Sequence, residues 1–453
     1  MAKNLTEGNV LKSVVCFAIP YFISYFLQTL YGMADLFIIG QYDSVAAITA
    51  VAVGSQVMHM LTVMIVGLAM GATVGIAQAI GANKKERAAF NIGNTATLFM
   101  ALSVALTAVL ILFVRLIVHA MATPEQAVDG TARYLTICFL GIPFITAYNI
   151  IGSVFRGLGD SKTPMYFVTL ACVVNIALDY LFIGLFGLSA AGAALGTVFS
   201  QAISVVAAIV VIRRRGTGIS LKKRDFKVRR PVMGRLLKIG VPIALQDGFI
   251  QISFIVITII ANRRGLTDAA AVGIVEKIIG FLFLVPSSLL STVSALGAQN
   301  IGAKKDKRAI QILFDAAAIA VVFGVSIVGC VQFESARAVG LFTADAATVA
   351  AGALYLKGYV WDCLFAGIQF CFSGYFCACG KSHLSFLHNI IAIVFVRVPG
   401  AYWTSLAFPE TLYPMGLSSA AGSLLSIFIC AIAFAIITKN KGRDLLRDLF
   451  CKV

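Results

Sequence analysis

The chain contains one short motif twice, at positions about half a chain apart. AQAIGANKKERA at 77–88 and AQNIGAKKDKRA at 298–309 are identical at eight of twelve positions in a chain of 453 residues. Pro20 and Pro242 stand at matching places in the two halves. An internal repeat of half the chain length predicts two similar structural units, which is a plan typical of membrane transporters.

Apolar stretches fill both halves. The chain is 60% hydrophobic and 12% charged, whereas a soluble protein carries about 25% charged residues. Each stretch is long enough to cross a bilayer core of about 30 Å as a helix. The stretches lie at about 13–40, 51–77, 91–114, 131–155, 163–185, 190–212, 236–262, 271–298, 309–331, 350–376, 384–407 and 417–438. We therefore predict an all-α integral membrane protein with twelve transmembrane helices in two six-helix repeats.

The most polar segment divides the chain. We expect an N-lobe at 1–212, a linker at 213–235, a C-lobe at 236–438 and a tail at 439–453. The N-terminal segment carries few charges before its apolar run and lacks a small-residue cleavage site, so we expect the first span to be retained.

Positive charges are distributed unevenly between the two sides of the predicted bundle. Most of the 36 Lys and Arg residues fall in alternate connections, which include the linker and both copies of the repeated motif. The positive-inside rule places these connections and both termini in the cytoplasm. The net charge of +16 therefore reflects membrane orientation and attraction to anionic lipid, and we expect no nucleic-acid partner.

The cysteines do not indicate a disulfide framework or a metal centre. Almost all ten lie inside predicted spans, away from external loops. Cys377, Cys379 and His383 have a spacing that suggests metal binding. A single pair of this kind at a helix end, without a second cluster, is more typical of a structural role.

Polar residues inside the apolar spans of the first half are candidates for function, because a carboxylate is costly in a membrane unless it is paired, protonated or hydrated. Asp35 in the first span and Asp179 in the fifth are such carboxylates. Residues four apart share a helix face, and the polar residues that share faces with these acids or lie on the sixth span are Ser24, Gln28, Tyr31, Asn175, Thr197 and Gln201. Oxygen ligands of this kind suit a small hard cation or a transferable proton. Two alternatives stay open: Asp35 lies near the membrane interface, or Asn175 and Thr197 only join helices through hydrogen bonds.

The second half offers a different set of polar residues. Asp247 and Gln251 lie in the seventh span and Asp362 in the tenth, while Lys277 in the eighth could pair with either aspartate across helices. Together with the first half, the candidate substrate-cavity residues are Gln28, Tyr31, Gln201, Gln251, Asp247, Asp362 and Lys277.

Turn residues predict where helices end or bend. In RGLGDSKTP at 156–164, Asp160 and Ser161 are suited to cap the following helix. Gly81 and Gly302 are expected to break the two helices that carry the repeated motif. Prolines inside predicted spans remove backbone hydrogen bonds and are expected to produce kinks or hinges; these are Pro143, Pro242, Pro286 and Pro399.

Taken together, these motifs resemble the multidrug and toxic compound extrusion family of cation-coupled exporters, in its bacterial branch. The likeness extends over about residues 10–440. It is carried by both copies of the repeated motif, by RGLGDSKTP, and by Pro20, Asp35, Gly40, Asn175, Asp179 and Thr197.

The resemblance implies a V-shaped pair of six-helix lobes around a central cavity, which exports organic cations or amphipathic compounds in exchange for Na⁺ or H⁺. It implies that Asp35, Asn175, Asp179 and Thr197 bind the coupling ion, as Na⁺ ligands if the protein is sodium-coupled. It implies no cofactor besides that ion. The expected partners are a small amphipathic or cationic substrate and membrane lipid, and the expected state is a monomer in the bacterial inner membrane. One branch of the family has a glutamate in the seventh span, and this chain has none at 241–260.

Three other classes of protein are less consistent with the sequence. A related exporter of a lipid-linked saccharide or a metabolite would line its cavity with several basic residues, and only Lys277 and Arg397 lie inside spans. An intramembrane enzyme would need a catalytic motif such as His-Glu-x-x-His, which is missing from the sequence. A channel would not need coupled acids in an internal repeat. We therefore expect a cation-coupled antiporter that works by alternating access and is not an enzyme.

Overall fold

The computed structural model describes residues 4–450, with side chains described for 4–214 and 216–439. Cys451 lies outside these residues, and for almost all of the predicted tail at 439–453 no side chains are described. Eleven helical segments in the described chain are long and apolar enough to cross a membrane, and a bent pair of shorter helices makes a twelfth. No strand occurs among the described residues. The predicted all-α class with twelve spans is confirmed.

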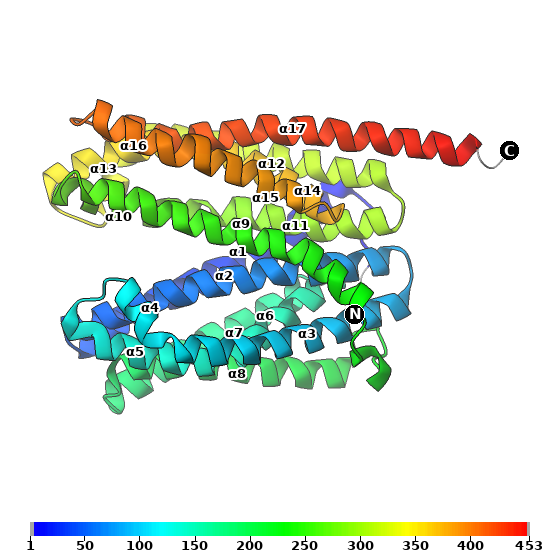
Figure 1. Ribbon diagram of the computed structural model, residues 1–453, viewed down its shortest axis with the longest axis horizontal. Coiled ribbons are helices and arrows are strands. Elements are labelled where there is room, and N and C mark those ends of the chain that lie inside the picture. The colour runs from blue at the N-terminus through cyan, green and yellow to red at the C-terminus, as the bar shows by residue number, and fades with distance from the viewer. Residues whose placement is uncertain (1–3, 451–453) are drawn as a thin grey trace. The chain divides into compact units, whose positions relative to one another are not determined.

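In the first half, long helices alternate with short connections (Figure 1). The helices are α1 (Val10–Tyr42), α2 (Val45–Gly81), α3 (Lys85–Leu112), α4 (Val114–Ala120), α5 (Glu125–Leu140), α6 (Ile142–Gly157), α7 (Lys162–Asp179), the π-helix η1 (Tyr180–Leu185) and α8 (Ser189–Arg215). The linker contains a short 3₁₀ helix, η2 (Lys223–Phe226).

The second half repeats this pattern, including a π-helix in its fifth span. The helices are α9 (Arg230–Asn262), α10 (Leu266–Leu282), α11 (Leu284–Gly302), α12 (Asp306–Gly340), α13 (Ala346–Tyr359), α14 (Trp361–Ala378), α15 (His383–Ala392), the π-helix η3 (Ile393–Arg397), α16 (Val398–Ala407) and α17 (Tyr413–Phe450).

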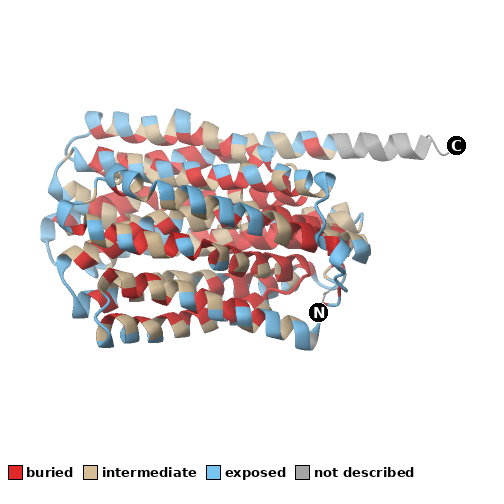
Figure 2. Cartoon of the chain, turned by 60° about the horizontal axis from the view of Figure 1, so that its bottom comes forward, coloured by how far each residue is buried: buried red, intermediate tan, exposed pale blue. Residues whose placement is uncertain are grey.

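The contacts group the chain into two compact units, each with its own core. The first unit consists of residues 1–244 with 295–309, and the second of 245–294 with 310–453. Helices α2, α5, α6 and α8 enclose the core of the first unit, and α9, α10, α13 and α14 contribute to the core of the second. Figure 2 shows that buried and exposed residues alternate along the helices, because each helix turns one face to its neighbours.

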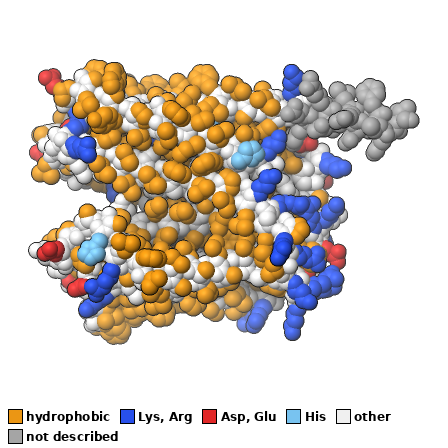
Figure 3. Space-filling view, viewed as in Figure 1, with side chains coloured by type: hydrophobic (Ala, Val, Ile, Leu, Met, Phe, Trp, Pro, Cys, Tyr) orange, Lys and Arg blue, Asp and Glu red, His pale blue; other side chains and the backbone are white. Residues whose placement is uncertain are grey.

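The outer surface has the character of a membrane protein. On the visible face of each unit, hydrophobic side chains cover the length of the helices, and more Lys and Arg side chains gather at one end than at the other (Figure 3). Large apolar residues such as Phe37, Phe333 and Phe395 are more than half exposed. Lipid rather than water is the solvent that suits such a surface.

The predicted helix caps and proline kinks are confirmed in part. Asp160 caps α7 as predicted, because its carboxylate accepts hydrogen bonds from the backbone N–H groups of Lys162 at 3.1 Å and Thr163 at 3.2 Å. Ser161 makes no side-chain capping bond. The prolines act unequally. The span of α5 and α6 bends by 52° beside Pro143, whereas α9 continues through Pro242.

Gly81 and Gly302 do end α2 and α11, but not for the predicted reason. The left-handed backbone conformation in these turns belongs to Asn83 and Lys304, with φ of 55° and 60°. Each glycine instead allows close packing. A Cβ atom at Gly81 would clash with the backbone carbonyl of Gln299, and one at Gly302 would clash with the carbonyl of Gln78. The repeated motif therefore packs against its own second copy.

The segment before α1 is held by the second copy of that motif. The N–H of Leu5 donates to Gln299 Oε1 at 2.7 Å, and Lys305 Nζ donates to the carbonyl of Thr6 at 2.9 Å. The guanidinium of Arg308 donates to two further carbonyls of the segment, those of Glu7 and Gly8, at 2.8 Å each. We call residues 4–9 the N-terminal strap.

The segment before α9 is held in the corresponding way by α3 of the first half. Asn94 donates to the carbonyl of Asp225 at 3.1 Å and accepts from the N–H of Arg229 at 2.8 Å. Thr97 donates to the carbonyl of Phe226 at 2.8 Å. We call residues 222–229 the linker strap. Each half of the chain thus fastens the segment that leads into the other half.

Candidate functional site

Three helices of the first half bring the predicted polar cluster together. Asp35 of α1, Asn175 and Asp179 of α7 are all buried, with at most 3% of each residue exposed. Thr197 of α8 donates a hydrogen bond to Asp35 Oδ2 at 3.4 Å. Asp35 also lies in electrostatic contact with Asp179 and Asn175. All four predicted ion-coupling residues therefore meet in one place.

The local sequence explains why α7 and α8 approach closely at this point. Gly196 faces the cluster, and a Cβ atom there would clash with Asp179 Oδ1 and lie 3.5 Å from Asn175 Nδ2. Asp179 is also the last residue of α7 before the π-helix η1. A π-helix widens the helical turn and is frequent at functional sites.

The cluster is acidic and lacks a counter-charge. Among the described residues, no Lys, Arg or His forms an ion pair with Asp35 or Asp179. Asp35 Oδ1, both carboxylate oxygens of Asp179 and both polar atoms of the Asn175 amide have no hydrogen-bond partner there. Two ionised carboxylates so close together and so deeply buried repel each other and are poorly solvated. The cluster is therefore suited to take up positive charge.

The atoms of the cluster limit the kind of cation that it can hold. Two carboxylates, an amide oxygen and a hydroxyl offer hard oxygen ligands, which suit a small hard cation or a proton. The described residues contain no group of three or more His, Cys, Asp and Glu side chains that could hold a metal ion. None of the four cluster residues carries a thiol or an imidazole, which are the side chains that favour transition metals.

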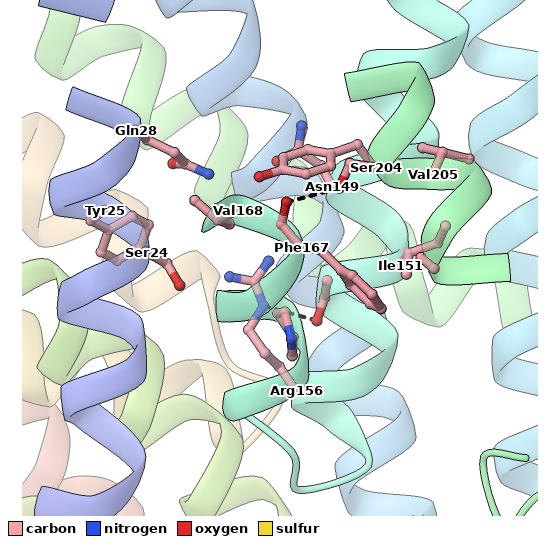
Figure 4. Close-up of a pocket in the computed structure, with 14 residues that line it drawn as sticks. Ser24, Tyr25, Gln28, Asn149, Ile151, Arg156, Phe167, Val168, Ser204 and Val205 are labelled. Carbon is pink, nitrogen blue, oxygen red and sulfur yellow. Dashed lines mark hydrogen bonds between the residues drawn. The ribbon is translucent and has the colours of Figure 1, made fainter. Parts of the chain in front are cut away.

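Three of the predicted cavity residues continue the cluster along α1 and α8. Tyr31 lies beside Asp35 and in contact with Gln201 and Tyr148. Gln28, one turn earlier on α1, lines a pocket between α1, α6, α7 and α8 (Figure 4). Tyr148 lines the same pocket, so the pocket and the acid cluster are neighbours.

The polar residues of the second half form a separate group around Arg397. The guanidinium of Arg397 donates to the hydroxyl of Tyr359 at 2.6 Å and lies over the ring of Phe254, 4.7 Å from its centre. Asp362, only 1% exposed, lies in electrostatic contact with Arg397 and Ser423. Unlike the first-half cluster, this group contains its own cation.

The other predicted residues of the second half lie apart from that group or at its edge. Lys277 is exposed and forms no ion pair with Asp247 or Asp362. Asp247 faces Cys377 instead. Gln251 is half-buried in α9. The second half therefore does not assemble Asp247, Gln251, Lys277 and Asp362 into one site.

The sequence does not reveal the contacts of two cations of the helices, the buried Arg397 and the half-buried Arg156. Arg397 was recognised as an intramembrane charge, but its contacts with Phe254 and Tyr359 join three separate helices and follow no periodicity. Arg156 opens the predicted turn RGLGDSKTP, yet its guanidinium lines the pocket of Figure 4. The only sequence signal is a single Arg, which stands at the end of an apolar run for Arg156 and inside one for Arg397.

Comparison with known proteins identifies the family. The sequence model of the MatE family matches residues 20–181 and 242–403, once in each half. The chain is 28% identical to "Probable multidrug resistance protein YoeA" of Bacillus subtilis, over 88% of this chain and 87% of that protein. It is 25% identical to "Multidrug export protein MepA" of Staphylococcus aureus, over 98% and 95% of the two chains.

Solved structures show the same fold. The structure described as "Crystal structure of MATE in the straight conformation" superposes with a TM-score of 0.89 at 22% identity, and the match covers 97% of this chain and 98% of that one. Because the family match recurs in both halves and spans most of the chain, this protein belongs to the multidrug and toxic compound extrusion (MATE) family of membrane transporters.

Proposed function

We propose that this chain is a secondary antiporter that exports amphipathic organic cations and takes up Na⁺ or H⁺ in exchange. The coupling ion binds at the cluster of Asp35, Asn175, Asp179 and Thr197. The protein works by alternating access and catalyses no covalent chemistry.

The proposal is carried by one observation: two buried carboxylates meet at Thr197 and Asn175 without a cationic partner. A bound proton or sodium ion relieves the repulsion between Asp35 and Asp179 and completes their unfilled coordination. An ion can drive a conformational change only by binding one state more tightly than the other. Because the four residues come from three helices, a small shift of α1 against α7 and α8 changes that affinity.

The cycle follows from this dependence. In the outward-facing state the cluster takes up the ion, and the loss of negative charge weakens the attraction for an organic cation, which leaves to the outside. In the inward-facing state the cluster releases the ion, regains its charge and attracts the next substrate. Exchange is obligatory because the same negative charge serves both cations.

The substrate class and the orientation have separate support. The names of the two relatives describe multidrug resistance and multidrug export. A cavity beside the acidic cluster of Asp35 and Asp179 favours cationic substrates, because the cluster has no positive partner among the described residues. The gathering of Lys and Arg at one end of the helices (Figure 3) supports a bacterial inner-membrane protein with both termini in the cytoplasm. We propose that it acts as a monomer.

Efflux from proteoliposomes tests the proposal. A fluorescent organic cation is loaded, and a sodium gradient and a pH gradient are imposed separately. We expect one gradient to drive efflux, and Asp35→Asn and Asp179→Asn each to slow it by more than about tenfold, a barrier increase of about 1.4 kcal/mol. Asp129→Asn is the matched control, because Asp129 is exposed on α5.

Two outcomes contradict the proposal. If neither gradient drives efflux by the folded wild-type protein, the protein is not an ion-coupled exporter of this substrate. If efflux is driven but both cluster variants retain the wild-type rate, the coupling ion binds elsewhere.

A further inference from the structure

The pocket of Figure 4 lies beside the acid cluster but belongs to a different part of the first half. Its polar lining comes from Ser24 and Gln28 of α1, Tyr148, Asn149 and Arg156 of α6, and Ser204 of α8. Its volume is about 30 Å³, and a cavity of about 10–15 Å³ already accommodates a water molecule. Pockets for organic ligands measure about 300–1,000 Å³. The pocket therefore fits water or a small cation, and it is too small for an organic substrate.

A continuous polar face of α1 joins this pocket to the cluster. Ser24, Gln28, Tyr31 and Asp35 follow one another at helical spacing along that face. Asp35 lies seven positions after Gln28, which corresponds to about 10 Å along the helix. Tyr31 fills the interval and contacts Gln201 and Tyr148 from the facing helices.

Unsatisfied polar atoms mark the same interval. The carbonyl oxygen of Gln201 is buried without a hydrogen-bond partner among the described residues, and the buried hydroxyl of Tyr148 faces only the Gln28 amide, without a hydrogen bond of ordinary geometry. Gln201 is 6% and Tyr148 is 8% exposed. Buried polar atoms are rarely left unpaired unless water or an ion serves them. The two atoms stand where a hydrated ion would pass between the cluster and the pocket.

Arg156 stands at the other end of the pocket, where α6 ends. Its Nε donates to the carbonyl of Gly152 at 3.0 Å, and its guanidinium lies 5.2 Å from the centre of the Tyr21 ring. Among the described residues no acid forms an ion pair with it. Its positive charge is therefore uncompensated at the point where the pocket approaches the end of the bundle.

We propose that this pocket is the inward exit of the coupling cation. The ion released by Asp35 and Asp179 passes Tyr31, Gln201 and Tyr148, is rehydrated beside Gln28, and leaves past Arg156. The guanidinium of Arg156 is an electrostatic barrier that keeps the cation from leaking through when no substrate is being exported. The proposal rests on the ion coupling proposed above.

The experiment measures ion release and substrate efflux separately in proteoliposomes. Uptake of the coupling ion is followed with a pH-sensitive dye or with radioactive sodium, and substrate efflux by fluorescence. Gln28→Leu and Tyr148→Phe remove polar atoms from the passage. We expect each to slow ion uptake and coupled efflux about tenfold, a barrier change of about 1.4 kcal/mol. Tyr166→Phe is the matched control, since Tyr166 is exposed on α7.

Arg156 is tested in the opposite direction. Arg156→Gln removes the barrier and is expected to raise ion uptake in the absence of substrate several-fold, whereas Arg156→Lys keeps the charge and restores a low leak. Arg213→Gln controls for the loss of a positive charge at the same end of the bundle, because Arg213 is exposed at the end of α8.

The outcomes separate this proposal from the proposed function. Suppose that the wild-type protein is ion-coupled and that Asp35→Asn abolishes the coupling. If Gln28→Leu and Tyr148→Phe then keep the wild-type rates, the proposed exit route is wrong, whereas the proposed antiport function stands. An unchanged leak in folded Arg156→Gln overturns the barrier. If Arg156→Gln does not fold, the two passage variants decide. Absence of gradient-driven transport in the wild type overturns the proposed function and the exit with it.

Discussion

Gly196 sets the distance between α8 and the acid cluster. It lies directly before Thr197, which contacts Asp35, and its missing side chain leaves the space that the Asp179 carboxylate occupies. A glycine in a helix interior costs about 0.5–1 kcal/mol relative to alanine, so its presence here is explained by close approach. Gly196 therefore sets how closely α8 approaches the carboxylate of Asp179.

Gly196→Ala should disturb coupling without changing any ion ligand. The added methyl group must displace either Asp179 or α8, and such overpacking costs about 1–3 kcal/mol. We expect gradient-driven efflux to fall by about tenfold or more, with a lower melting temperature in detergent. Gly329→Ala, where a Cβ atom meets no atom within 4 Å, should leave both quantities unchanged. Wild-type efflux in Gly196→Ala would show that the approach of α8 does not matter.

Site residues were predictable from the sequence where their spacing along a single helix was the signal. The spacing of Asn175 and Asp179 places them on one face of α7, and an uncompensated acid in an apolar span points to function whatever packs against it. Contacts between helices were not predictable in this way. The environment of Arg397 depends on Phe254 and Tyr359, which lie far from it in the chain, and no local pattern contains that information.

At the scale of helices, glycines allow backbone-to-backbone packing at one end of the first unit. A Cβ atom at Gly71 would clash with the carbonyl of Leu236, and one at Gly240 would clash with the carbonyl of Leu68, so α2 and α9 pack through a reciprocal pair of glycines. The Gly81 and Gly302 contacts join α2 to α11 in the same reciprocal way. These contacts have to separate if this end of the bundle opens during the cycle.

Substitution at these contacts should act on the conformational equilibrium. In Gly302→Ala the new methyl group meets a backbone carbonyl, which cannot rotate away, so the closed packing of α2 and α11 is destabilised by about 1–3 kcal/mol. We expect slower coupled efflux and faster labelling by a membrane-impermeant thiol reagent of a cysteine introduced at Gln78. Gly340→Ala, which meets no atom within 4 Å, is the control. Labelling at the wild-type rate in Gly302→Ala would contradict a gating role for this contact.

Helix boundaries were largely predictable, and irregular turns were not. Apolar length alone locates the spans, because only a helix satisfies its backbone within the membrane. The π-helices η1 and η3 escaped prediction, since a widened turn has no signature of its own in composition. The sequence predicts only that each copy of the repeated motif ends a helix. Its glycines serve a contact between its two copies, which a reading of each helix by itself cannot show.

At the scale of the whole molecule, the charge distribution predicts which side of the membrane the linker faces, and the linker strap predicts how firmly the linker is held. Trypsin should cleave the linker at 213–229 when it is added to inside-out vesicles, and not when it is added to right-side-out vesicles. Asn94→Leu removes two hydrogen bonds to the linker strap, and an unpaired buried group costs about 1–3 kcal/mol, so cleavage should become faster. Thr49→Ala, which removes a solvent-exposed hydrogen bond to the carbonyl of Val45 within α2, should not change the rate. Cleavage from the outer side would reverse the proposed orientation.

The crossed fastening of the two straps has a consequence for biogenesis. The linker strap can close as soon as residue 229 has been made, because α3 already exists by then. The N-terminal strap has to wait until Lys305 and Arg308 have been synthesised, although it comes before α1 in the chain. The segment that precedes α1 is thus fastened only after α11 has been made, and a nascent protein truncated before residue 305 would keep this strap unfastened and open to quality-control proteases.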